Sequence, residues 1–141
     1  MKLVIKIGAL LLASSILTGV YASDSKEQKL KSTMSNFASA LELIQHGILY
    51  NKKDEMYKGS QLLSIDQQRF IQLHGNTLKE YIPNNPKFAY DYAKSTSQRI
   101  QKLTDKLNSS LGRDKDFSII ASTYGHIVQE CVVCHQKIRD K

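Results

Sequence analysis

The chain has 141 residues, which is enough for one domain with a single core. Its formal net charge is +7, but the lysines and arginines are spread along the sequence and form no single basic stripe. Nucleic-acid binding, which needs a concentrated basic surface, is therefore disfavoured.

The first residues have the pattern of a secretory signal peptide. Met1–Lys6 is a short basic start, and Ile7–Val20 is an apolar run without a charged residue. Val20–Ala22 fits the small-residue pattern of a cleavage site. The apolar run is shorter than the roughly 20 residues that a membrane-spanning helix needs. We therefore expect residues 1–22 to be removed on export, leaving residues 23–141 as one domain without a membrane anchor.

The next segment predicts a long amphipathic helix from about residue 26 to residue 49. Ser25–Gln28 has the form of a capping box, which favours a helix start there. Apolar residues then recur at alternating spacings of four and three, which places them on one side of a helix. These residues are Leu30, Met34, Phe37, Leu41, Ile44 and Ile48.

A shorter second helix is expected next, with Asn51 as its cap and its end near Leu63. Ile65–Tyr81 has a less regular pattern. A further helical stretch in this range would turn Phe70, Ile71 and Leu78 inward.

Asn84–Pro86 predicts the start of a third helix, because asparagine is a good cap and proline suits the first helical position. This helix is expected to run from Pro86 to about Asn108, and Ser109–Gly112 is expected to end it. Its apolar residues at helical spacing are Ala93, Ile100, Leu103 and Leu107.

The last predicted helix is capped by Asp114 or Asp116. Strand signals are too weak to compete anywhere in the chain. The sequence therefore predicts an all-α protein, an antiparallel four-helix bundle, which is a common frame for a buried cofactor. The apolar face of the last helix consists of Phe117, Ile120, Tyr124, Ile127, Cys131, Cys134 and Ile138.

Residues 131–135 read Cys-Val-Val-Cys-His and contain both cysteines of the chain. This is the attachment sequence of c-type haem. Cys131 and Cys134 share a helix face, so both thiols can bond to one edge of the same haem, and His135 can bind its iron. Covalent haem attachment takes place outside the bacterial cytoplasm, in agreement with an exported protein. The expected location is the periplasm.

Two other uses of a cysteine pair are a thiol redox centre and part of a zinc site. A thioredoxin-like pair opens a helix after a strand, whereas this pair lies at the far end of a helical pattern. A zinc site would need further ligands at short spacing, and no second cysteine pair exists. Both comparisons favour haem.

An exported helical domain with its Cys-x-x-Cys-His motif in the last helix resembles class II cytochrome c, the cytochrome c prime family. The resemblance covers the whole mature chain in helix order. It implies one covalently bound haem, with thioether bonds to Cys131 and Cys134 and with His135 as the proximal axial ligand. It also implies that Arg139, four residues after this histidine, lies beside the proximal haem face.

In this family the first helix provides the residue on the distal side of the iron. The residue is apolar in five-coordinate, high-spin members and methionine in six-coordinate, low-spin members. The resemblance therefore implies that Met34 is the distal ligand, although Leu30 stands where relatives often carry an arginine. Met56 on the second helix is a competitor. If a second histidine bound the iron in place of a methionine, it would be His74.

The distal ligand separates two functions. A methionine-bound iron suits electron transfer, whereas an open apolar distal side would bind small gases such as nitric oxide or carbon monoxide. Electron transfer is the expected function, with no enzymatic activity, since no acid–base group is placed to act above the haem. His46, His74 and His126 are each expected at the surface or in a connection.

The mature domain would carry a charge of +5, because cleavage of residues 1–22 takes two lysines and no acidic residue from the total of +7. A modest positive charge favours redox partner proteins with an acidic docking surface. The resemblance adds the expectation of a homodimer, with a monomer as the alternative.

Overall fold

The structure is a computed structural model that describes the backbone of residues 18–80, 84–113 and 116–138, and side chains from residue 26 onward. This part of the chain contains four helices and no strand, so the all-α prediction is confirmed. No helix within it is long and apolar enough to span a membrane. The helices are α1 (Thr18–Tyr50), α2 (Lys53–Glu80), α3 (Pro86–Gly112) and α4 (Phe117–Ile138).

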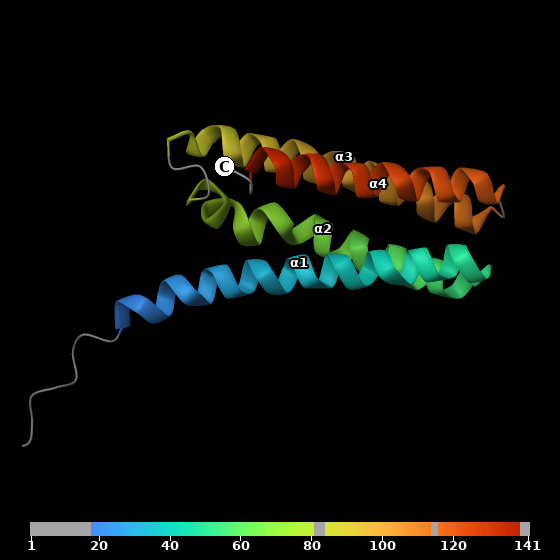
Figure 1. Ribbon diagram of the computed structural model, residues 1–141, viewed down its shortest axis with the longest axis horizontal. Coiled ribbons are helices and arrows are strands. Elements are labelled where there is room, and N and C mark those ends of the chain that lie inside the picture. Colours follow the sequence, from blue (N-terminus) through green and yellow to red (C-terminus); the bar gives the residue numbers. More distant parts are fainter. Residues whose placement is uncertain (1–17, 81–83, 114–115, 139–141) are drawn as a thin grey trace, which may run out of the picture.

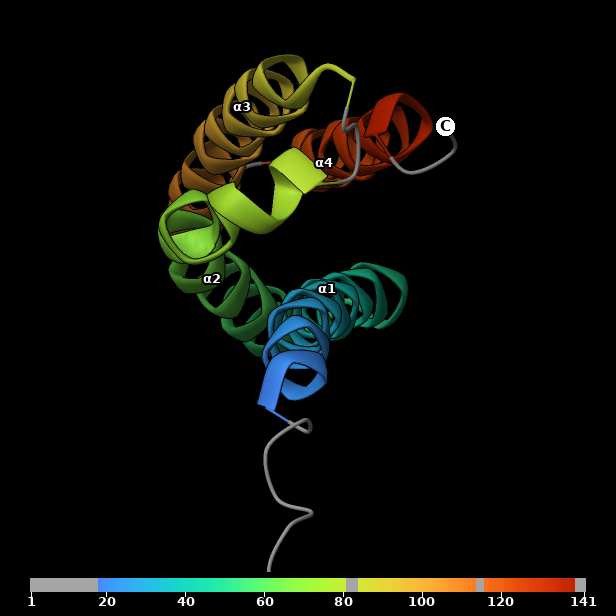
Figure 2. The same cartoon turned by 90° about the vertical axis from the view of Figure 1, so that its left-hand side faces the viewer.

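Consecutive helices run in opposite directions along a common axis (Figure 1). Helix α2 packs against both α1 and α3, and α3 packs against α4. Helices α1 and α4 contact each other far less than the neighbouring pairs do. Viewed along the axis, the helices form an open arc in chain order, with α1 and α4 at its two ends (Figure 2).

The start of α1 differs from the expectation. The helix begins at Thr18 and passes through Ser25–Gln28, so the prediction that a capping box starts the helix there is wrong. The physical reason is that residues 18–24 contain no proline, and the helical backbone continues through them. The signal-peptide prediction falls mostly on residues 1–17, which lie outside the described residues.

The role of Asn51 also differs from the expectation. Its φ of 53° is left-handed, and the Lys52 amide donates a hydrogen bond of 2.8 Å to the Gly47 carbonyl. This bond is the closing contact of a Schellman motif, in which the residue after the helix adopts the left-handed conformation. Asn51 therefore ends α1 and does not cap α2, because asparagine tolerates this conformation better than most residues.

Helix α2 is one continuous helix of 28 residues, so the predicted end near Leu63 is wrong. The apolar pattern weakens there because the middle of α2 meets α3 through buried polar groups. The Ser97 hydroxyl donates to Gln67 Oε1 at 2.8 Å, and Gln101 Nε2 donates to Ser64 Oγ at 3.0 Å. A search for apolar periodicity does not detect a helix face of this kind. Farther along α2, Phe70 and Leu78 are buried, as expected.

The predicted starts of the last two helices are confirmed. Asn85 Oδ1 accepts a hydrogen bond of 3.2 Å from the Phe88 amide, with Pro86 at the first helical position. Asp116 Oδ1 accepts a bond of 2.9 Å from the Ser118 amide at the start of α4. Helix α3 runs four residues past its expected end, to Gly112, because Leu111 is buried in the core.

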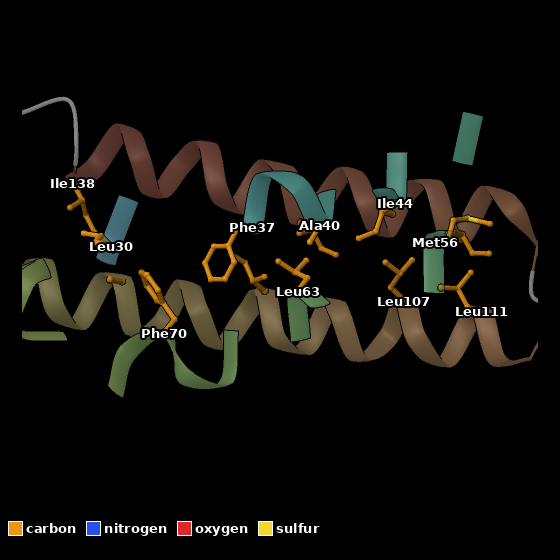
Figure 3. Packing of buried hydrophobic residues seen from close by; sticks show 14 of the residues in the cluster. Leu30, Phe37, Ala40, Ile44, Met56, Leu63, Phe70, Leu107, Leu111 and Ile138 are labelled. Atoms are coloured by element: carbon orange, nitrogen blue, oxygen red, sulfur yellow. The ribbon is translucent and has the colours of Figure 1, made fainter. Parts of the chain in front are cut away.

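The core is a single cluster that extends along the bundle (Figure 3). Leu30 and Ile138 lie at one end, and Met56 and Leu111 lie at the other. The predicted apolar side of α1 divides into two rows within this core. Leu30, Phe37 and Ile44 are fully buried, whereas Met34, Leu41 and Ile48 are only partly buried.

The closest approach of α1 and α2 depends on Gly59. A Cβ atom at this position would lie 2.6 Å from the Ala40 carbonyl oxygen and 3.0 Å from the Ile44 amide nitrogen. We expect Gly59→Ala to lower the free energy of unfolding by about 1–3 kcal/mol, because the two backbones must separate. Gly125→Ala is the matched control, since nothing lies within 4 Å of its Cβ position. The control should be stabilised by up to about 1 kcal/mol. Equal effects of the two substitutions in urea denaturation would contradict this packing.

Candidate functional site

Both cysteines lie in the last third of α4, about one helical turn apart on the same face. Both are partly buried and pack against the core cluster, and neither forms a disulfide. His135 follows on the next position of the helix and is exposed. The structure thus confirms that the two thiols share the inner side of α4, with an accessible imidazole directly beside them.

The thiols are poor acids in this environment. Burial raises the pKa of Cys131 to about 11, with smaller contributions from the charges of Cys134 and Glu130. Burial also raises the pKa of Cys134, and this effect is partly offset by the hydroxyl of Thr96 and the charge of Arg99. A thiol redox pair requires the opposite, namely a lowered pKa and a reactive thiolate. The electrostatics of the site therefore weaken the thiol redox alternative.

Arg99 of α3 lies beside the cysteine pair and hydrogen-bonds residues of both α3 and α4. Its Nε donates to Glu130 Oε2 at 2.9 Å, and its Nη2 donates to Thr96 Oγ1 at 2.9 Å. One side chain thus links α3 to the turn of α4 that precedes Cys131. Nothing in the local sequence indicates this contact, because its partners are 31 residues apart.

Met34 lies at the same level of the bundle as the cysteine pair. Leu30 and Ile138 belong to the same core cluster and lie at the same end of the bundle (Figure 3). Helices α1 and α4 run in opposite directions (Figure 1). The helical rise therefore puts Met34, four residues after Leu30, and Cys134, four residues before Ile138, each about one turn farther into the bundle. The predicted distal and proximal residues therefore belong to the same end of the molecule.

Met56 is placed at the opposite end. It is 2% exposed and lies with Leu107 and Leu111 near the turn between α1 and α2 (Figure 3). The long axis of the bundle separates it from the cysteines. The structure thus removes Met56 as an alternative to Met34.

The three other histidines have different environments. His46 and His126 are exposed, as expected, and His46 hydrogen-bonds Glu55 beside the turn between α1 and α2. His74 is only 4% exposed, so the prediction of a surface or connecting position is wrong for this residue. Its Nε2 lies 2.8 Å from Thr33 Oγ1, next in sequence to Met34. No local pattern indicates this contact, because it joins residues 41 positions apart.

Arg139 lies outside the described residues, so its predicted place beside the proximal haem face remains a prediction. Among the residues that the structure describes, no group of three or more histidine, cysteine or acidic side chains could hold a metal ion.

The chain matches no protein-family model, and comparisons with curated proteins and with solved structures likewise found no match. The resemblance to class II cytochrome c therefore rests on the residues themselves.

The burial of His74 predicts a pH dependence of stability. Burial lowers the pKa of His74 from its ordinary 6.5. Thr33, which it hydrogen-bonds, and Phe70, whose ring it contacts, carry no charge that would offset this. The unfolded chain then binds a proton more readily than the folded protein. The free energy of unfolding should therefore fall as the pH drops below about 6.5, with no contribution from this group at higher pH.

Urea denaturation across this pH range tests the effect. His74→Phe should remove this part of the pH dependence, whereas His46→Gln, at an exposed histidine, should retain it. An unchanged slope in His74→Phe would contradict the assignment.

Proposed function

We propose that this chain is a monohaem c-type cytochrome that carries electrons, with Cys131 and Cys134 as the haem attachment points. The observation that carries the proposal is the arrangement of the motif. Two half-buried, poorly acidic thiols lie one turn apart on the inner side of α4, and the exposed His135 follows them directly. A raised pKa is unfavourable for thiol exchange, whereas the Cys-x-x-Cys-His sequence is that of haem attachment.

The surroundings fit a large apolar group. Helices α1 and α4 make few contacts with each other, and each presents apolar side chains that the core covers only in part. Covering such surface is favourable at about 25 cal/mol per Å². A porphyrin held on α4 would cover it. The partly buried apolar residues of these two helices that pack against the core are Met34, Leu41, Ile48, Tyr124, Cys131 and Cys134.

In this proposal His135 is the proximal ligand and Met34 is the distal ligand. When bound, haem supplies an iron that changes oxidation state by one electron. The residues of the chain keep the same two ligand atoms available in both states, the imidazole nitrogen and the soft thioether. The thioether favours a raised reduction potential. These properties suit a carrier of electrons, and we propose no enzymatic activity.

The second candidate function is the binding of small gases by a five-coordinate iron. The partial exposure of Met34 favours it, since a flexible thioether at a partly open position can leave the iron. Nitric oxide or carbon monoxide would then occupy the distal side. The two functions differ in whether Met34 stays bound to the iron or leaves the distal side open.

The remaining parts of the proposal concern location and partners. Residues 1–22 would direct export to the periplasm, where the haem would be attached. The mature charge of +5 would favour redox partners with an acidic surface, and a homodimer is proposed only from the resemblance. Arg139 would lie beside the proximal haem face.

Replacing both cysteines tests haem attachment. Cys131→Ser with Cys134→Ser keeps the size of the side chains but removes both thioether bonds. After maturation in a host that makes c-type cytochromes, the wild-type protein should retain one haem through denaturation, as measured by intact mass. The double variant should retain none, and Cys131→Ser alone should keep haem through one bond. Haem that stays attached to the denatured double variant would refute the assignment.

Replacing each methionine tests the distal ligand. Met34→Ala should leave haem attached but convert a low-spin absorption spectrum to a high-spin one that responds to carbon monoxide. Met56→Ala is the matched control, since Met56 lies at the other end of the core. The control should lose about 2–5 kcal/mol of stability and keep the low-spin spectrum. An unchanged spectrum in Met34→Ala would remove Met34 from the site.

A further inference from the structure

A partly buried hydrogen bond joins α1 to α2 beside Met34. His74 Nε2 lies 2.8 Å from Thr33 Oγ1, and the same hydroxyl lies 3.1 Å from the Lys29 carbonyl oxygen. A hydroxyl has one proton, which it donates to the carbonyl. Its lone pairs are then free to accept a hydrogen bond from the tautomer of His74 that carries its proton on Nε2.

Aromatic rings hold the same part of α1 one turn farther along. The Phe70 ring centroid lies 5.7 Å from that of His74 and 5.6 Å from that of Phe37. Helix α2 thus contacts α1 at Thr33 through a hydrogen bond and at Phe37 through a ring. Met34 lies between these two points, on a helical turn that is held at both ends.

We propose that Thr33 and His74 are positioning residues for Met34, and that their hydrogen bond keeps its thioether in place as the distal ligand. This inference rests on the proposed function. The side chain of Met34 is partly buried and has three rotatable bonds, so its own packing constrains it weakly. The place of its helical turn then decides where the sulfur lies, and the hydrogen bond between Thr33 and His74 holds that turn against α2.

The test compares Thr33→Val with Thr33→Ser in the mature, haem-loaded protein. Valine has nearly the same shape as threonine but cannot accept the bond from His74, whereas serine retains the hydroxyl. The readouts are the near-infrared band of thioether-bound ferric haem and the affinity of the reduced protein for carbon monoxide. We expect Thr33→Val to weaken the band and to raise the affinity about tenfold. Thr33→Ser should stay within about twofold of the wild type.

A second pair covers the case in which Thr33→Val does not fold. His74→Leu removes the donor, whereas His74→Gln retains an N–H group that can reach Thr33. The leucine variant should behave as Thr33→Val, and the glutamine variant should restore the band. A purely structural role would lower the unfolding midpoint without changing the band or the affinity, and this result would overturn the inference.

The outcomes also separate this inference from the proposed function. If Met34→Ala opens the iron to carbon monoxide while Thr33→Val and His74→Leu match the wild type, only the positioning role is wrong. If His74→Leu opens the iron and Met34→Ala does not, His74 is itself the ligand and both assignments fail. Absence of haem from the wild-type protein would likewise overturn both.

Discussion

The contact between α1 and α2 is the interaction on which the arrangement of the site depends. Gly59 lets the two helices approach closely in the middle, and Leu30, Phe37 and Ile44 are buried along the length of α1. This packing sets the position of α1 along the bundle axis. Since α2 also packs against α3, and α3 against α4, the same contact sets the position of α1 relative to α4, which lies at the other end of the arc (Figure 2).

The two ends of that arc make few contacts with each other, and both carry partly buried apolar side chains. Helices α2 and α3 also carry such residues, at Ile71, Tyr92 and Leu103. If haem is attached to α4 as we propose, it would cover part of this apolar surface. Haem binding and folding would then be coupled, because the cofactor would cover surface that the chain leaves open.

Features determined by neighbouring residues were predictable from the sequence. The caps at Asn85 and Asp116, the helical character of the chain and the shared face of Cys131 and Cys134 all follow from short spacings. The haem attachment proposed for residues 131–135 also rests on consecutive residues, and it stays a prediction. The caps and the shared helix face could be predicted because their physical causes lie within one or two helical turns.

Features determined by distant residues were not predictable. The middle of α2 lacks a clear apolar pattern because Ser64 and Gln67 pair with polar groups of α3. His74 is buried and hydrogen-bonds Thr33 on another helix, which its own neighbours in the sequence do not indicate. Asn51 ends one helix where the local sequence favours a cap for the next, and only the bond from Lys52 to Gly47 distinguishes the two roles.

The most direct test of the account is the absorption spectrum of the wild-type protein, matured in the periplasm and recorded oxidised and reduced, with and without carbon monoxide. We expect a covalently bound haem with low-spin bands in both states and no response to carbon monoxide. A high-spin spectrum that shifts with carbon monoxide would contradict ligation by Met34 and make gas binding the function. A protein without haem absorption would contradict the account as a whole.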